Sequence, residues 1–276
     1  MAIEFKPVRT ARLNVQLQEL TLGSAGAVCQ VPAEQNERTT TVLLKKAIAS
    51  AVMNGTNGVT DPLAMTVQER ALLVAHYLMR VTKDGPDFAL GKGRLSDYLS
   101  ERTELRQPST VVEDKDGKNW KIYPLLGAHT QALEVMCSVR GEWMLGACAC
   151  QVFSESEIPP DWLAMSDNET QDWVAARTAQ LDEMAESDFE AMFSAWTQGR
   201  SVLDHFFRQD FNDEGVVFMP WATQEGGAGD VPARFLPRSC LSALSLAIYD
   251  RPERVGGPAG AAREYFPPSG EQYPAQ

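Results

Sequence analysis

Cysteine and histidine side chains are the first candidates for chemistry in this sequence. Cys137, Cys148 and Cys150, with His129 upstream, are the kinds of ligand that hold a tetrahedral metal. The spacing argues against such a site, because Cys-x-Cys with one lone cysteine lacks the second knuckle of a structural zinc site. We interpret the cysteines as small buried hydrophobic residues, and we expect neither a metal nor a cofactor.

A hydrolytic triad would need one of the three histidines, His76, His129 or His205. None of them neighbours a recognisable nucleophile motif, since Gly-x-Ser-x-Gly is absent. A triad is assembled in space, however, so a cytosolic enzyme with a site built from distant residues stays open as an alternative. The leading prediction is a protein without catalytic residues.

A fragment of a phosphate-binding loop occurs at Gly91-Lys92-Gly93-Arg94. A Walker loop needs a buried strand before it and a serine or threonine after its lysine, and both are missing here. The segment is therefore predicted to be a turn before a helix.

Acidic residues are concentrated between Glu155 and Glu190. This segment contains eleven carboxylates and only one basic residue, Arg177. Paired carboxylates suit acid–base chemistry or a hard cation. Many of these, however, fall in the first turns of predicted helices, where the helix dipole stabilises negative charge. Capping and a solvated face explain most of the run, and docking of a basic partner is the alternative.

Two apolar features are candidates for partner binding. The first is a stripe along the last long predicted helix, which is usually core but also suits an interface: Phe189, Phe193, Trp196, Leu203 and Phe207. The second is the Pro/Gly-rich segment after Arg251, whose anchors between prolines suit an arm that orders on a neighbouring surface: Tyr265, Phe266 and Tyr273.

The elements expected to position these residues fall into three segments. Residues 1–60 combine a strand at Leu13–Leu17, a break at Gly23–Gly26 and a helix from about Thr41 to Val52. Residues 61–210 form a helical body, and residues 211–276 form a Pro/Gly-rich C-terminal extension.

Capping boxes define the helical body. Thr66 and Glu69 begin a helix that ends near Asp84, and Asp116-Gly117 predicts a β-hairpin at residues 110–123. Ser166-x-x-Glu169 and Ser187-x-x-Glu190 begin two long helices, read as an antiparallel helical hairpin. The predicted fold class is therefore α+β and mainly α-helical, with a small β-hairpin, a long helical hairpin and an extended C-terminal arm.

The net charge of −12 makes nucleic acid an unlikely partner, because an acidic surface repels phosphates. No apolar run approaches the roughly 20 residues of a membrane span, so no membrane insertion is expected. Five unevenly spaced cysteines are typical of a reducing compartment.

The segment from Asp61 to Leu73 resembles the T4-type baseplate assembly protein family of tailed bacteriophages, in which a threonine precedes a charged helix start and an apolar helix. Tyr123-Pro124-Leu125-Leu126-Gly127 and the following Ala132-Leu133-Glu134 are similar to segments of small phage tail proteins. The resemblance implies a non-enzymatic structural or assembly protein of the virion tail or baseplate. It would be made in the host cytoplasm and contact other tail proteins or copies of itself. An acidic assembly chaperone, absent from the finished particle, is a further alternative.

Overall fold

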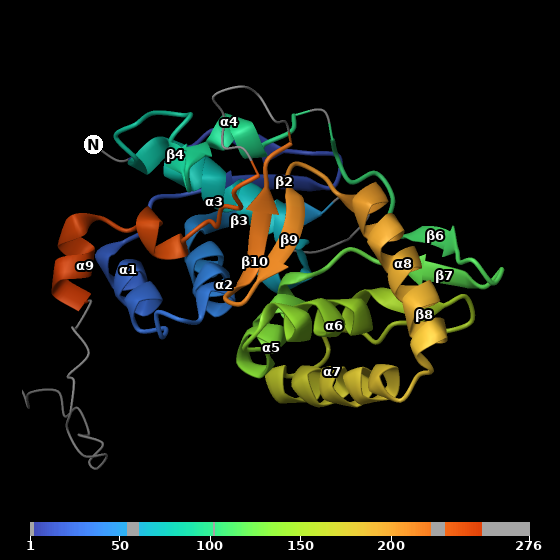
Figure 1. Cartoon of the computed structure of the whole chain (residues 1–276). Coiled ribbons are helices and arrows are strands. Elements are labelled where there is room, and N and C mark those ends of the chain that lie inside the picture. Colours follow the sequence, from blue (N-terminus) through green and yellow to red (C-terminus); the bar gives the residue numbers. More distant parts are fainter. Residues whose placement is uncertain (1–2, 54–60, 102, 222–229, 250–276) are drawn as a thin grey trace, which may run out of the picture.

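The computed structural model describes residues 3–53, 61–101, 103–221 and 230–249, which form a mainly helical α+β fold, as predicted (Figure 1). In these ranges the helices are α1 (Leu22–Cys29), α2 (Asn36–Ala47), α3 (Val67–Val81), α4 (Leu95–Tyr98), α5 (Gly127–Met136), α6 (Arg140–Gln151), α7 (Asp167–Asp182), α8 (Glu186–Leu203) and α9 (Ala243–Tyr249), with 3-10 turns η1 (Pro62–Ala64) and η2 (Pro237–Cys240). The strands are β1 (Val8–Arg9), β2 (Leu13–Leu17), β3 (Ile48–Met53), β4 (Ala89–Leu90), β5 (Gly93–Arg94), β6 (Thr110–Glu113), β7 (Asn119–Ile122), β8 (Val152–Ser154), β9 (Arg208–Asn212) and β10 (Gly215–Met219).

All described strand pairs are antiparallel. The sheets β1-β2-β3 and β6-β7-β8 have three strands each, and β4-β5 and β9-β10 are two-stranded. Gly91 lies in the turn between β4 and β5 with a φ of +59°, just before α4. The prediction of a turn before a helix in that segment is confirmed.

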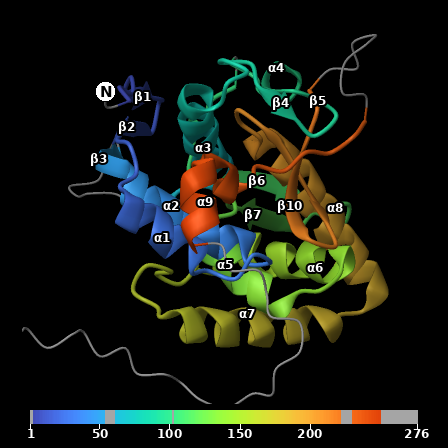
Figure 2. The same ribbon diagram turned by 90° about the vertical axis from the view of Figure 1, so that its left-hand side faces the viewer.

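The N-terminal segment differs from the prediction in two places. The predicted helix to Val52 is wrong at its end, because Ile48–Met53 pairs with β2 as β3. Strand pairing across the chain overrides local helix propensity there. The predicted break at Gly23–Gly26 is also wrong: Thr21 caps α1 by accepting the Ser24 N–H, and Gly26 lets the Tyr249 ring of α9 approach. Figure 2 shows α9 standing beside α1.

Helix α3 lies at the centre of the fold, and its capping box is confirmed. The Thr66 hydroxyl accepts the Glu69 N–H at 3.1 Å, and the Glu69 carboxylate accepts the Thr66 N–H at 2.9 Å. The helix ends at Val81, slightly before the predicted Asp84. Most of its residues are buried, including polar ones, so α3 is enclosed by other elements on nearly all sides.

The predicted β-hairpin is confirmed as β6 and β7. The Asp114 carboxylate accepts the N–H groups of Asp116 and Lys118 and the indole N–H of Trp120, while Gly117 takes a φ of +81°. β8, which follows α6 directly, adds a third strand, and α8 packs across β6 and β7. The hairpin is thus part of the folded body.

The two predicted long helices are present as α7 and α8, but they pack mainly on different elements. α7 lies along α5 and α6, whereas α8 lies on β6 and β7 (Figure 1). The capping box at Ser187 and Glu190 is wrong: α8 begins at Glu186 after Ala185, without a side-chain cap. Acidic side chains in its first turn stabilise that helix end instead.

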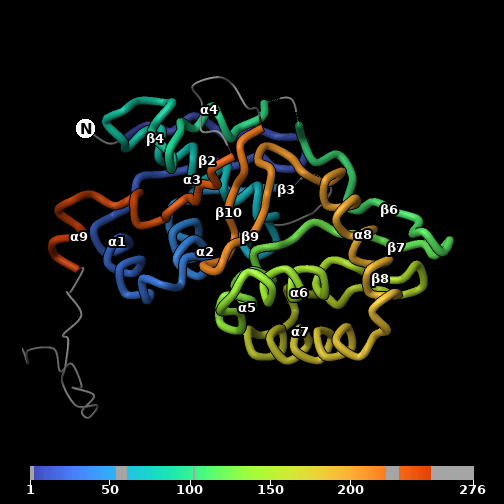
Figure 3. Tube along the Cα trace, viewed as in Figure 1, coloured from blue at the N-terminus to red at the C-terminus, as the bar shows by residue number. Residues whose placement is uncertain are grey.

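One large hydrophobic core draws on residues from all three sequence segments, from Phe5 to Leu241. A smaller cluster of buried residues, Ala128, Phe153 and Trp162, lies apart from it. The trace in Figure 3 runs from α5 through α6 and β8 to α7, and the small cluster belongs to this stretch. The predicted C-terminal arm lies outside the described residues.

Candidate functional site

A pocket of about 500 Å³ opens beside the small hydrophobic cluster. Its walls are largely apolar, with Tyr123 and Trp162 as aromatic members and prolines at 108, 124, 159 and 160. The polar residues among them include Arg12, Arg106 and His129. An apolar hollow with a few convergent polar groups is the usual form of a binding site.

The back wall of the pocket is the start of α5, which is tied to the start of α3. The Val67 N–H donates to the Leu125 carbonyl at 3.0 Å, and the Gly127 N–H donates to the Met65 carbonyl at 2.9 Å. These two bonds join residues 61–73 to residues 123–127. A pocket wall with backbone ties of this kind is held in place before any ligand arrives.

Within the described residues, His129 is the only fully buried ring of this wall that has a polar atom without a hydrogen bond. Its Nδ1 accepts the Leu126 N–H at 3.1 Å, so Nδ1 carries no proton. Burial lowers the pKa of His129 to about 3, so the neutral ring carries its proton on Nε2 at physiological pH. Among the described residues, that Nε2–H has no hydrogen-bond partner. The Trp162 and His129 rings form a T-shaped pair, with 4.4 Å between the centroids.

His205 is the contrasting case. Its Nδ1 donates to the Leu203 carbonyl at 2.8 Å, and its Nε2 accepts the Thr66 hydroxyl at 2.9 Å. Burial lowers the pKa of this ring to about 4, and both nitrogens are satisfied. His205 therefore has a structural role, holding the N-terminus of α3 against the end of α8.

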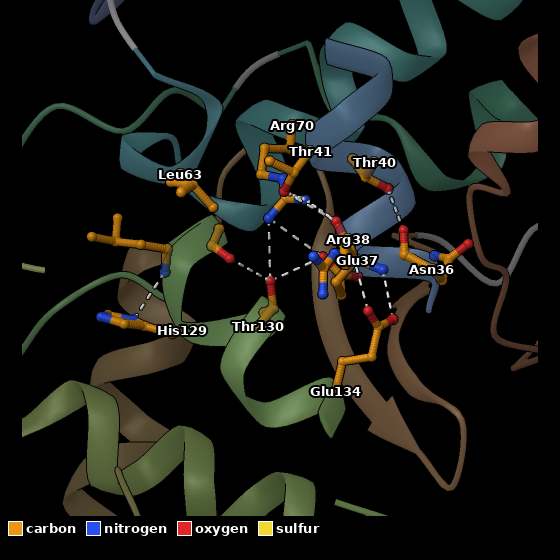
Figure 4. Close-up of polar contacts among 12 residues, drawn as sticks. Asn36, Glu37, Arg38, Thr40, Thr41, Leu63, Arg70, His129, Thr130 and Glu134 are labelled. Atoms are coloured by element: carbon orange, nitrogen blue, oxygen red, sulfur yellow. Dashed lines mark hydrogen bonds and ion pairs between the residues drawn. The ribbon is translucent and has the colours of Figure 1, made fainter. Parts of the chain in front are cut away.

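A buried polar cluster lies behind the pocket wall and holds α2, α3 and α5 together (Figure 4). The Arg70 guanidinium donates to the Glu37 carbonyl at 2.6 Å and to the hydroxyls of Thr41 and Thr130, and it lies 3.5 Å from the Glu37 carboxylate. Thr130 in turn donates to that carboxylate at 2.9 Å. Figure 4 shows His129 on the far side of the α5 start from this cluster.

Glu134 completes the cluster at the N-terminus of α2. Its carboxyl oxygens accept the N–H groups of Glu37 at 2.6 Å and Arg38 at 3.0 Å. These bonds satisfy orphan amides of the first helical turn. Burial and the nearby Glu37 carboxylate raise the pKa of Glu134 to about 7.

Two arginines bring positive charge to the pocket. The Nε of Arg12 lies 3.3 Å from the Glu69 carboxylate, and a terminal nitrogen approaches the Met53 sulfur at 3.4 Å. Arg106 is exposed at the rim, and no ion pair of its side chain occurs within the described residues. Asp161 also lines the pocket, and Arg12 is paired with Glu69, so Arg106 is the cation of the lining that has no ion pair within the described residues.

We expect the two buried histidines to stay neutral at pH 5 and to show opposite tautomers. Long-range ¹H–¹⁵N correlation spectra should show His129 protonated on Nε2 and His205 protonated on Nδ1, because each tautomer is fixed by its hydrogen-bond partner. His76, which is half-buried, serves as the internal comparison. An imidazolium signal from His129 at pH 5 would contradict this assignment of the pocket wall.

The pH dependence of the free energy of unfolding is a weaker probe of these histidines. The two buried histidines and two buried carboxyl groups change it in opposite directions. The unfolded chain protonates the two histidines first, so their contribution falls as pH drops below 6.5. Burial raises the pKa of Asp204, like that of Glu134, to about 7, so these carboxyls are protonated first in the folded protein. The contribution of these two carboxyl groups to the free energy of unfolding therefore increases as the pH falls from 6.5 to about 4.5.

The predicted apolar stripe divides into buried and half-buried parts. Trp196, Leu203 and Phe207 are at most 3% exposed and belong to the main core, whereas Phe189 and Phe193 are partly exposed. Phe207 lies beyond the end of α8 at Leu203, so its expected place in the helix is wrong. Tyr265, Phe266 and Tyr273 lie outside the described residues.

The cysteines are placed as small buried or half-buried side chains. Burial raises the pKa values of Cys137 and Cys148 to about 12, so both stay protonated at neutral pH, whereas metals bind the thiolate. The described residues contain no group of three or more His, Cys, Asp or Glu side chains arranged to hold a metal ion. Within the same residues, no histidine pairs with a carboxylate or a thiol.

No motif in the sequence points to Arg12, Arg106 or Trp162 as members of a site. The one local signal was Ile158-Pro159-Pro160, whose rigid backbone precedes Trp162 and forms part of the pocket wall. Arg12 and Arg106 come from distant loops and meet only in the fold. In the described ranges, no helix has the length and apolar character to cross a membrane. Comparisons with protein-family models, curated proteins and solved structures found no match.

Proposed function

We propose that this chain is a non-enzymatic structural or assembly protein of a phage tail or baseplate, and that its pocket holds a segment of another tail protein. One observation carries the binding role. The described pocket lining offers apolar walls, arginines, the Asp161 carboxylate and a neutral histidine donor, but no serine, threonine, cysteine or lysine nucleophile. Such a set of groups orients and retains a ligand, whereas bond-breaking chemistry needs an activated nucleophile or a poised base.

The low pKa of His129 supports binding over catalysis. A general base works best when its pKa lies near the working pH, and burial lowers that of His129 to about 3. Its free nitrogen also already carries the proton, so it donates and does not abstract. The alternative of an enzyme with a distant-residue site would need another location.

The assignment to phage tails comes from the resemblance. Its two segments, around Asp61–Leu73 and Tyr123–Gly127, are joined at the back of the pocket, and both contribute to its lining through Ala64, Tyr123 and Leu126. A shared feature of tail assembly proteins would be expected to keep a common binding surface. This supports the proposal that the pocket serves assembly, with other tail proteins or further copies of the chain as partners.

The test is whether the protein occurs in particles and whether its pocket is needed there. In cells producing the phage, we expect the chain at fixed stoichiometry in purified tails. We also expect Arg106→Glu to lower the yield of complete tails severalfold, because it reverses charge in the pocket. Lys92→Glu, the same charge change at an exposed turn outside the pocket lining, should leave the yield unchanged.

Two outcomes would favour the alternatives. Recovery of the chain only from lysate, never from particles, would indicate an assembly chaperone. Complete tails at normal yield from phage lacking the gene would contradict any tail function.

A further inference from the structure

We infer that the pocket recognises a carboxylate side chain, aspartate or glutamate, within an extended segment of the partner protein, with His129 Nε2–H and Arg106 as the groups that bind it. The inference rests on the proposed function and deepens it, because it names the chemistry of the occupant. A buried donor without a partner, arginines at the rim and apolar walls all favour the same ligand.

The unpaired His129 donor is the central observation. A buried polar atom without a hydrogen-bond partner destabilises the fold, so native proteins rarely keep one without a reason. His129 is 1% exposed, and a backbone bond fixes its tautomer, so the ring cannot exchange its donor for an acceptor without losing the Leu126 bond. We therefore expect the ligand to supply a hydrogen-bond acceptor for His129 Nε2–H.

The arginines select a charged acceptor over a neutral one. Arg106 forms no ion pair within the described residues, and Arg12 uses its Nε on Glu69 and one terminal nitrogen on a weak sulfur acceptor. A guanidinium binds carboxylates through two parallel N–H groups, and charge-assisted hydrogen bonds are about twice as strong as neutral ones. A carboxylate therefore gains more here than an amide of the same shape.

A cationic ligand in an aromatic cage is the rival, since Tyr123, Trp162 and Asp161 also line the pocket. Three facts oppose it. The Asp161 carboxylate already accepts the Leu163 N–H at 3.2 Å, the arginines repel a cation, and His129 offers a donor where a cation would need an acceptor.

The walls indicate how the rest of the ligand is held. Prolines at 108, 124, 159 and 160 have no N–H, so these parts of the rim cannot add a bound strand through a backbone ladder. An extended segment would instead be held by its side chains. A volume of about 500 Å³ suits a carboxylate residue together with an apolar neighbour.

Trp162 packs against the imidazole ring that carries this donor. The His129 Nε2 has almost no accessible surface, and the Trp162 ring is T-shaped to the imidazole and also T-shaped to Trp173, with 4.7 Å between the two indole centroids. A ligand that reaches Nε2 therefore has to shift the Trp162 ring. This shift supplies a spectroscopic readout that is independent of any biological assay.

The test compares three probes by NMR titration of the full-length, ¹⁵N-labelled protein: acetyl-Leu-Glu-Pro-amide, its glutamine twin acetyl-Leu-Gln-Pro-amide, and glutarate. We expect the glutamate peptide to bind at least about tenfold more tightly than the glutamine peptide, and to shift the His129 ring and Trp162 indole signals. Arg106→Gln should remove most of this preference, and Lys92→Gln should keep it. His129→Asn retains an acceptor for the Leu126 N–H while deleting the Nε2 donor, and should also lose the preference.

Each contrary result has a definite meaning. Equal binding of the two peptides, or no binding of either at millimolar concentration, would overturn the carboxylate assignment. Glutarate binding as tightly as the glutamate peptide would overturn the peptide assignment in favour of a small acid. If His129→Asn does not fold, the exposed Arg106 variant decides the question alone. A failed titration combined with a tail defect of Arg106→Glu would reject this inference and leave the proposed function standing.

Discussion

Replacing Arg70 with methionine is expected to lower the free energy of unfolding by about 3–5 kcal/mol. The guanidinium is 2% exposed and bonds three groups from α2 and α5, two of them hydroxyls. Methionine fills a similar volume but leaves the Glu37 carboxylate without its buried cation. Urea unfolding followed by circular dichroism at pH 7 measures the loss.

A matched control and a double variant separate charge from packing. Arg38→Met changes an exposed arginine on α2 and should shift the unfolding free energy by less than about 0.5 kcal/mol. Glu37→Gln added to Arg70→Met should recover part of the loss, because it removes the carboxylate left unpaired. Equal effects of Arg70→Met and Arg38→Met would contradict the account of the buried cluster.

Trp196→Ala is expected to cost about 3–5 kcal/mol of unfolding free energy. The ring is 1% exposed, its indole N–H donates to the Gln151 side chain at 3.1 Å, and the Arg200 guanidinium lies 4.8 Å from the ring centroid. Truncation removes this packing and leaves the Gln151 oxygen without its partner. Urea unfolding measures the change.

Val202→Ala is the control for this prediction, since Val202 is 57% exposed on the same helix and should be nearly neutral. The comparison also decides how the apolar stripe works. If Trp196→Ala leaves stability intact and instead abolishes binding of a partner protein, the residue belongs to an interface and its burial in the core is refuted.

Local signals in the sequence predicted the elements whose determinants lie close together along the chain. The Thr66–Glu69 and Ser166–Glu169 boxes identify α3 and α7, because both partners of each cap lie within one turn. Asp116-Gly117 identifies the β6-β7 hairpin for the same reason. Short-range hydrogen bonds are readable without knowing the fold.

Local sequence patterns predict wrongly those elements whose conformation depends on contacts with distant parts of the chain. Ile48–Met53 is a strand because β2 lies beside it, and α1 tolerates Gly26 because Tyr249 packs there. The pocket is the extreme case, since Arg12, Arg106 and Trp162 are far apart in sequence. His129 was noticed as a possible metal ligand, but its significance lies in one unpaired nitrogen, which depends on the Leu126 backbone.

The most direct test of the binding account is site-specific photo-crosslinking during phage assembly. A benzophenone amino acid replaces Leu163, which is 55% exposed in the pocket wall, or Leu244, which is 67% exposed on α9 and outside the pocket lining. We predict that position 163 gives one crosslinked tail or baseplate protein, with the crosslink at or next to an acidic residue, and that position 244 does not give this product. The same product at both positions, or none at 163, would contradict the claim that this pocket holds the partner.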